Sequence, residues 1–366
     1  MSTQLPTDST QLQADTPEED NAPTRKLSIA DLEEEHRRYF IRAITRVVST
    51  EIAEVTYAQL FDGLPLSDVA SNRNYSSFHN DHPIYDVHEG LCPGMMDKAR
   101  KFRDEFQLEA FRFDAQAAAP GSRAFNIRLI ELVAVALHQI AVVIYQRDES
   151  IHKNDGVHDW KPPKSDERYW RNHPDGPSPT LFHHPWYVDH DQYPNGAADM
   201  AGYRAEDQII GGVVLFDRRD PTETPDADSN AIYLHPGRYE ASYRIVQLLP
   251  EQRQALLDFL VGEDEPTAPL LPIIVEEANT KRVDPEEPIR ETGIYRDLWE
   301  RRDLPLRQGT ADYGMYGIHT TFLQRRTIML LAIEQGCGGG EYRMKKTKRL
   351  RAHSVFEHRE TWDRHA

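Results

Sequence analysis

The stretch LFHHPWYVDHDQYPNGAADMAGYRAEDQIIGGVVLFDRR, residues 181–219, holds the strongest structural signal in this chain. Its apolar run IIGGVVLF (209–216) is rich in Val and Ile and ends abruptly at a charged Asp-Arg-Arg, which predicts a buried, central strand. Histidines, tyrosines and carboxylates crowd the residues before this run. Because binding clefts are commonly built at the ends of rigid elements, this block is the first candidate for a functional site.

The composition is typical of a soluble globular protein. Of 366 residues, 39% are hydrophobic and 28% are charged, and the formal net charge is −17, so the chain on average repels nucleic acid. The N-terminus has no basic start and no apolar core, which argues against a secretory signal. With only two cysteines a disulfide framework is excluded, and we expect a cytoplasmic protein that does not engage a membrane.

Three segments differ in character. Residues 1–26 are polar and predict a disordered tail, 27–340 predict one globular domain, and 341–366 form a basic tail. Inside the domain the patterns predict helices at 28–61, 95–107, 122–146, 250–260 and 320–335, strands at 209–216, 242–249 and 269–275, and long irregular loops at 62–95 and 147–180. This order favours an α/β or α+β fold with a mixed sheet flanked by helices.

Candidates for acid–base chemistry lie in VDHDQYP and at the end of the 209–216 run. His190 stands between two aspartates, and a neighbouring carboxylate can orient an imidazole and raise its pKa. We therefore take His190, Tyr193 and Asp217 as the catalytic candidates. The alternative is a salt-bridged surface loop.

Candidates for substrate binding combine carboxylates with aromatic rings, a composition suited to a guanidinium group. They are Asp191, Asp199, Tyr203 and Glu206. The apolar helix at 122–146 adds Glu131 and His138, which share one face with Arg128. The alternatives are a solvated acidic face and an internal salt bridge.

A metal site is the weaker prediction. His79 and Asp81 form an HxD pair that His190 or His235 could complete, as in an iron facial triad. However, the chain contains neither HExxH nor paired CxxC motifs, and a chain with sixteen histidines readily contains HxD by chance. We therefore expect no metal and no cofactor. The P-loop and dinucleotide glycine patterns are also absent.

The basic tail RMKKTKRLR (343–351) contrasts with the acidic body. Together with nearby aromatic residues it suits binding of nucleic-acid phosphates and unpaired bases. The predicted contacts are Lys345, Lys346, Lys348, Arg349 and Arg351. The alternative is a disordered solubilising or localisation tail.

Three segments carry a resemblance to known proteins: 190–219, 235–260 and RVDPEEPIRETGIYRDLWERR at 282–302. Together they resemble a family of fungal proteins and, within fungal natural-product biosynthesis, the arginine-containing cyclodipeptide synthases. That resemblance covers about residues 120–305 and implies an aminoacyltransferase that joins arginine from arginyl-tRNA to the amino acid of a second aminoacyl-tRNA. His190 would then be the general base. Two other classes stay open: a metal-dependent oxygenase or hydrolase, and a non-catalytic interaction protein. The oligomeric state is not indicated.

Overall fold

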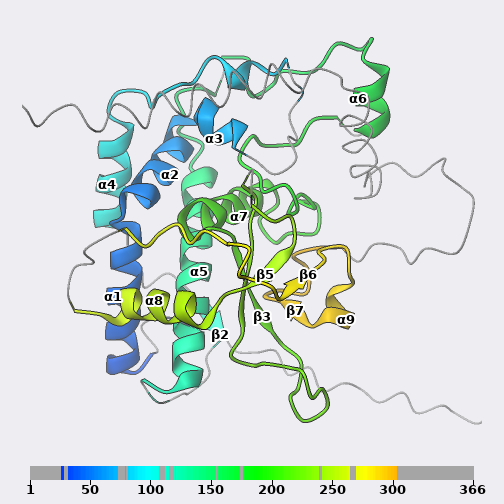
Figure 1. Cartoon of the computed structure of the whole chain (residues 1–366). Coiled ribbons are helices and arrows are strands. Elements are labelled where there is room, and N and C mark those ends of the chain that lie inside the picture. The colour runs from blue at the N-terminus through cyan, green and yellow to red at the C-terminus, as the bar shows by residue number, and fades with distance from the viewer. Residues whose placement is uncertain are drawn as a thin grey trace, which may run out of the picture.

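The computed structural model describes most of the chain up to Arg302. The described residues are 26–28, 32–72, 79, 81–106, 112–114, 119, 121–153, 155–173, 176–238, 241–263 and 269–302. The fold is α+β, one of the two expected classes: a group of helices packs beside a small curled sheet, and long loops lie at one end of the helices (Figure 1).

The helical half is built around α5 (Arg123–Gln146). As predicted, Ser122 caps this helix by accepting a hydrogen bond from the Phe125 amide. α7 (Ala197–Ile210), α1 (Glu34–Val48) and α2 (Glu51–Asp62) pack on α5, and α8 (Pro250–Val261) crosses α1. α4 (Met95–Glu105) packs on α2, and the short helices are α3 (Ser67–Ser71), α6 (Glu167–Asn172) and α9 (Ile289–Thr292).

The main sheet has the strand order β6-β5-β4-β3-β7, and every pairing in it is antiparallel. Its strands are β3 (Val213–Asp217), β4 (Ile232–His235), β5 (Ile245–Gln247), β6 (Arg282–Val283) and β7 (Ile294–Tyr295). β3 lies in the interior of the sheet, as the apolar run predicted. A separate pair joins β1 (Lys26–Ser28) to β2 (Arg112–Asp114).

Both faces of β3 are buried, which explains why its sequence is apolar throughout rather than alternating. Val214 and Phe216 enter the large core shared with the helices. Val213 and Leu215 face a second core that is rich in tyrosine and includes Tyr187 and Tyr203. The residues of the 181–219 block therefore connect the two cores.

Several predicted elements need correction. Ile209 and Ile210 are the last residues of α7, and Gly211 then turns the chain with a φ of +114° before β3 begins. An apolar run alone cannot separate a buried helix end from a strand. At Gly211 an added Cβ would lie 2.0 Å from the Ile273 carbonyl oxygen, so the turn also requires a residue without a side chain.

The predicted helix at 28–61 is two helices, α1 and α2. Thr50 adopts an extended conformation and caps α2 through its hydroxyl, which separates the two. The predicted start is also wrong, because Ser28 belongs to β1 and the N-cap position of α1 is Glu33, whose side chain makes no capping hydrogen bond. Lys26 likewise lies in β1, so the predicted tail extends one residue too far, and its other residues lie outside the described ones.

The predicted strand at 269–275 is not a strand. Two prolines in PLLPIIV remove backbone donors, and Ile273 instead donates a single hydrogen bond to the Ile210 carbonyl. Leu271 and Ile273 still enter the large core. The predicted strand at 242–249 is reduced to β5, and the predicted helix at 320–335 lies outside the described residues.

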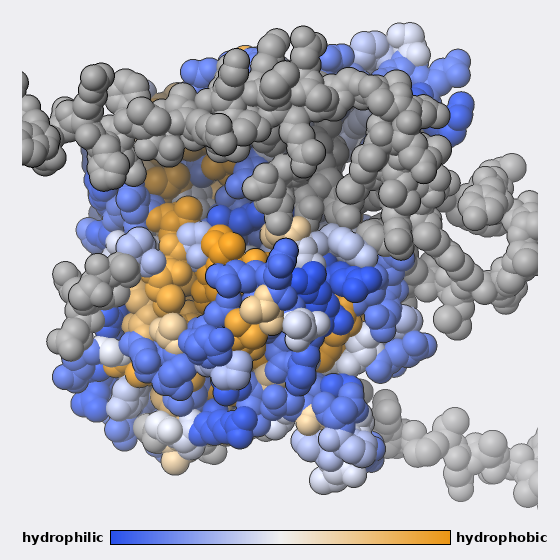
Figure 2. Space-filling model, in the orientation of Figure 1, coloured by the Kyte–Doolittle hydropathy of each residue, from blue (hydrophilic) through white to orange (hydrophobic). Residues whose placement is uncertain are grey.

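By length and composition, one described helix, α5, is apolar enough to cross a bilayer. However, 67% of its most apolar window is buried inside this fold, as a core helix requires. Figure 2 shows apolar residues gathered on one face of the helical half, with hydrophilic residues around them.

Candidate functional site

The carboxylates of the 181–219 block form a buried ionic network between α5 and α7. His138 lies between two of them: its Nε2 is 2.9 Å from an Asp199 oxygen and its Nδ1 is 3.0 Å from a Glu206 oxygen. Gly202, on the same face of α7, permits this approach, because an added Cβ would lie 2.5 Å from the His138 ring. The absence of a side chain at this position therefore lets the two helices pack around the imidazole.

A second cation, from the residue that follows β7, completes the network. Nη1 of Arg296 lies 2.9 and 2.8 Å from the two oxygens of Glu206, and its guanidinium also lies 5.6 Å from the centre of the Tyr203 ring. Burial alone would raise the pKa of Glu206, but Arg296 and His138 hold it below its usual value. Burial alone would lower the pKa of His138, but its hydrogen bonds with Asp199 and Glu206 raise it.

The sequence suggested that these carboxylates and aromatic rings suit a guanidinium ligand. Such an arrangement is present, and its occupant is the chain's own Arg296. Asp199, Tyr203, Glu206 and His138 are almost fully buried, with exposed fractions of 0–3%. A substrate would have to displace Arg296 and open the core to reach them. In this structure the network stabilises the packing of α5 and α7 against the segment that begins with β7.

An accessible part of the block lies at the loop before α7. His190 and Asp191 are exposed, and the Asp191 carboxylate pairs with Arg302. The hydrogen bond from Arg302 lowers the pKa of Asp191. Arg302 also lies 3.9 Å from an oxygen of Asp189. This loop therefore presents the Asp191 carboxylate and the His190 imidazole to solvent, whereas Asp189 is buried.

The other two predicted catalytic side chains are buried rather than exposed on this loop. Tyr193 is buried, its hydroxyl donates a hydrogen bond to the Glu300 carbonyl, and burial raises its pKa far above the usual value. Asp217 ends β3 and pairs with Arg219. Burial alone would raise the pKa of Asp217, but this partner holds it low. Asp217 therefore has a structural role in holding the loop after β3.

The predicted polar face of α5 divides between two environments. Glu131 receives hydrogen bonds from Arg128 and Arg218, each at 2.5 Å, which is the internal salt bridge that the sequence left open. His138, by contrast, belongs to the network with α7. The structure does not bring these two side chains into one site.

Glu300 is a residue that the sequence did not single out. It is fully buried, and burial raises its pKa to about 7 despite the nearby charges of Arg301 and Arg296. One of its oxygens accepts hydrogen bonds from the Arg296 and Asp297 amides. The other oxygen accepts none from the described residues and lies 3.6 Å from Arg301 Nε. The acidic stretch at 263–300 gave no signal that separated this carboxylate from its neighbours.

The proposed iron triad is not assembled. His79 pairs with Asp166 at 2.8 Å and lies 3.7 Å from Asp81, whereas His235 is buried in β4, near Tyr187. Within the described ranges a different group brings metal-binding atoms together, all within 4.8 Å of one another: Asp62, His88, Cys92 and His152. The histidines and cysteine of the 62–95 loop were the available signal, and they were missed because their partner lies sixty residues further along the chain.

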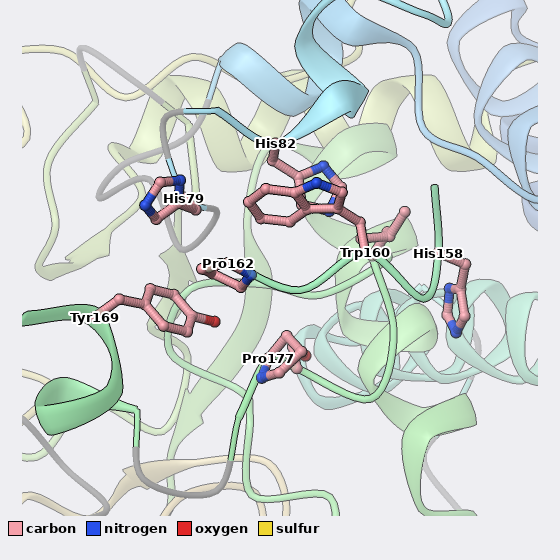
Figure 3. A pocket seen from close by; sticks show the side chains of 9 residues that line it. His79, His82, His158, Trp160, Pro162, Tyr169 and Pro177 are labelled. Carbon is pink, nitrogen blue, oxygen red and sulfur yellow. The ribbon is translucent and has the colours of Figure 1, made fainter. Parts of the chain in front are cut away.

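A small pocket lies between the same two long loops (Figure 3). His79 and His82 come from the first loop, and Trp160, Pro162 and Tyr169 come from the second. Ring contacts hold the loops together here, with 5.0 Å between the centres of His82 and Trp160 and 5.7 Å between those of His79 and Tyr169. The pocket offers imidazole and aromatic faces to a small ligand.

The basic-tail residues predicted to contact RNA lie outside the described residues. Comparison of the chain with known protein families, with curated proteins and with solved structures finds no match.

Proposed function

We propose that this chain is an aminoacyltransferase that makes an arginine-containing cyclic dipeptide from two aminoacyl-tRNAs. The observation that carries the proposal is that the three segments with the family resemblance pack together. Glu206 of the first segment pairs with Arg296 of the third, and Asp207 accepts a 2.7 Å hydrogen bond from the Gly237 amide of the second. Segments that share one packing unit are held in fixed positions relative to one another, as a reaction site requires.

The exposed rim of this unit, formed by His190 and Asp191, has the groups that the chemistry needs. Nδ1 of His190 lies 3.4 Å from the Val188 carbonyl. Because a carbonyl can only accept, the neutral imidazole carries its proton on Nδ1, and Nε2 keeps its lone pair. His190 Nε2 is therefore the proposed general base.

The reaction proceeds by two amine attacks. His190 removes a proton from the amine of one aminoacyl group, and the amine nitrogen then bonds to the ester carbonyl carbon of the other. The carbon–oxygen bond to the tRNA ribose breaks, and the proton passes to that ribose oxygen. The same exchange in the opposite direction closes the ring and releases the second tRNA.

The exposed Asp191 carboxylate, with the buried Asp189 beside it, is the proposed site for the arginine side chain. Arg302 already shows how a guanidinium lies against Asp191 and beside Asp189. A substrate arginine would take that position after Arg302 moves aside. Asp199 and Glu206, which the composition also suggested, have internal partners and stabilise the fold beneath the rim.

The test is mass spectrometry of the products. The full chain is expressed alone in a heterologous host, and the purified protein is then supplied with tRNA, arginine, the other amino acids, ATP and their synthetases. We expect an arginine-containing cyclic dipeptide whose formation requires tRNA. His190→Ala should lower its rate at least about 100-fold, because it removes the general base. Asp191→Asn should lower it at least about tenfold, because the substrate guanidinium that covers Asp191 would lose the partner of a desolvated charge pair, at a cost of about 2–5 kcal/mol.

The matched control is Asp226→Asn. Asp226 is also an exposed carboxylate with an arginine partner, Arg219 at 3.1 Å, but it lies in the loop after β3. It should leave the rate unchanged. Absence of any arginine-containing cyclic dipeptide with active synthetases present would refute the proposal. Equal rates for Asp191→Asn and the parent would remove arginine recognition from the rim.

A further inference from the structure

We propose that Asp62, His88, Cys92 and His152 form a zinc site that fastens the two long loops to the helical half. Asp62 is the last residue of α2, His88 and Cys92 lie on the loop before α4, and His152 follows α5. His88 and Cys92 are close in sequence, whereas Asp62 and His152 are brought to them by the fold. This inference is independent of the proposed transferase activity.

Three separations within the cluster are close to those around a tetrahedral ion. Bonds of about 2.0–2.3 Å to zinc imply ligand–ligand separations of roughly 3.3–3.8 Å. The Asp62 carboxylate lies 3.1 Å from His88 Nε2 and 3.4 Å from His152 Nε2. Cys92 Sγ lies 3.2 Å from His152 Nε2. All four ligand atoms lie within 4.8 Å of one another, so small movements of the side chains would bring them to the distances of a bound ion.

Hydrogen bonds behind the cluster aim both imidazoles inward. His88 Nδ1 donates to the Pro65 carbonyl at 3.1 Å, and His152 Nδ1 lies 2.6 Å from a carboxylate oxygen of Asp155. With a proton on each Nδ1, the neutral rings turn an Nε2 lone pair toward the cluster. Such outer partners are the usual means of orienting histidine ligands of zinc.

The inward atoms are therefore acceptors that face one another. Asp62 Oδ1 is buried and accepts no hydrogen bond within the described residues, while Oδ2 accepts one from the Cys92 amide at 2.8 Å and also lies 3.1 Å from His88 Nε2. A buried carboxylate oxygen without a partner is costly. A cation at the centre would satisfy this oxygen together with both imidazole nitrogens and the sulfur.

Charge and donor type select zinc. A thiolate and a carboxylate carry two negative charges, which a divalent ion neutralises while the imidazoles stay neutral. Sulfur and nitrogen donors suit Zn²⁺, and four protein ligands leave no open position for substrate, which is typical of a structural site. Asp62 and His88 are buried, so the neutral complex would cost little to enclose.

The backbone is shaped to close this cluster. The Asp62 carbonyl accepts hydrogen bonds from the Ile151 and His152 amides, both at 3.2 Å. The neighbouring Gly63 has a φ of +99°, and a Cβ there would lie 2.5 Å from the Ser150 side chain. Glycine is therefore required where the second loop approaches the end of α2.

Zinc would supply stability that the loops otherwise lack. Their own apolar cluster is small and consists of Leu64, Ala70, Ile84, Val157 and Leu181. The aromatic pocket of Figure 3 is built from the same two loops, so an ion that fixes them to each other also fixes the pocket walls.

The first experiment measures the metal in the full-length parent protein. After purification and dialysis against zinc with a weak competing chelator, we expect one zinc per chain. Replacement by Co²⁺ should give the visible bands of tetrahedral cobalt and a thiolate-to-cobalt charge-transfer band. Removal of zinc should lower the melting temperature and speed proteolysis within residues 63–94 and 147–182.

The variants identify the ligands. Cys92→Ser should remove the charge-transfer band, and His152→Ala should remove stoichiometric zinc. Asp155→Asn should weaken zinc binding by about 10–100-fold, the usual effect of losing an outer partner. Two matched controls should keep parental zinc binding: Cys337→Ser, the other cysteine, and Asp166→Asn, which pairs with His79 in the same loops.

A parent protein that takes up no zinc under these conditions, and shows no tetrahedral cobalt spectrum, overturns the proposal without requiring any variant to fold. A cobalt spectrum of the parent protein that lacks a thiolate band also overturns the assigned ligand set, as does a thiolate band that persists in Cys92→Ser. Neither result bears on the formation of a cyclic dipeptide, which is measured separately.

Discussion

Arg296 donates from one guanidinium nitrogen to both carboxylate oxygens of Glu206, at 2.9 and 2.8 Å, and both side chains are almost completely buried. This pair joins α7 to the residue that follows the edge strand β7.

Breaking this pair should destabilise the whole domain. Glu206→Gln leaves the Arg296 charge buried without its partner, and we expect the free energy of unfolding to fall by about 3–5 kcal/mol. The double variant Glu206→Gln/Arg296→Gln should lose much less stability than the sum of the losses in the two single variants, because the two side chains interact directly. Urea denaturation of both variants and the double variant measures this coupling. Glu223→Gln, at an exposed position, should have little effect.

Val214→Asp should be similarly severe. Val214 is fully buried in β3 and pairs with Leu234, so the new carboxylate has neither water nor a cation to stabilise it. We expect a loss on the order of several kcal/mol, seen as aggregation or a large drop in melting temperature. Val87→Asp is the matched control, because Val87 is 55% exposed. A stable Val214→Asp variant would contradict the interior position of β3.

Stability should depend on pH through Glu300. Because the pKa of this buried carboxyl rises to about 7, the folded state holds a proton that the unfolded state releases at a lower pH. Stability is therefore greatest below the unfolded pKa and falls as the pH rises toward 7. Glu300→Gln cannot ionise and should flatten this fall. Urea titrations at several pH values between 4.5 and 8 test it, and an unchanged slope would contradict the assignment.

His138 adds a second dependence of the same sign. Its pKa is raised in the folded state, so its contribution is present below the unfolded pKa and is lost as the pH rises through the folded value. Asp199 and Glu206 have lowered pKa values, so their contributions are lost at acid pH. His138→Gln should reduce the loss of stability on the alkaline side and leave the part due to Glu300.

RNA binding should depend on the basic tail. Neutralising Lys345, Lys346, Lys348, Arg349 and Arg351 removes five positive charges that could pair with phosphates. The slope of log K against log salt should flatten by about 0.7–0.9 for each phosphate that the tail no longer neutralises. Filter binding or fluorescence anisotropy with tRNA measures both quantities. If the neutralised chain binds tRNA with the parental affinity and slope, the tail does not bind phosphates.

Local patterns predicted the helices well where a cap and a long apolar face coincide. The start of α5 follows from Ser122 and the apolar residues after it, and α8 follows from Pro250. The join between α7 and β3 could not be placed, because Ile209 and Val213 look alike in a continuous apolar run. What separates them is the contact of Gly211 with Ile273, which is set by tertiary structure.

The candidate site was only partly predictable for the same reason. Charge and aromatic composition indicated a place for a guanidinium, but nothing near Glu206 indicated that Arg296 would fill it. Likewise, His88 and Cys92 share one loop, whereas Asp62 and His152 reach them only through the fold. Contacts across such sequence distances leave no periodic or spaced pattern in a single sequence.

The distance along the chain between Glu206 and Arg296 also bears on biosynthesis. Ninety residues separate them. While the ribosome is still adding these residues, α7 presents a carboxylate whose guanidinium partner does not yet exist, and α5 cannot enclose it without cost. Docking of these helices must therefore wait until β7 has emerged from the exit tunnel. Nascent chains released before residue 296 should stay open and sensitive to protease, although every residue of α5 and α7 has already been synthesised.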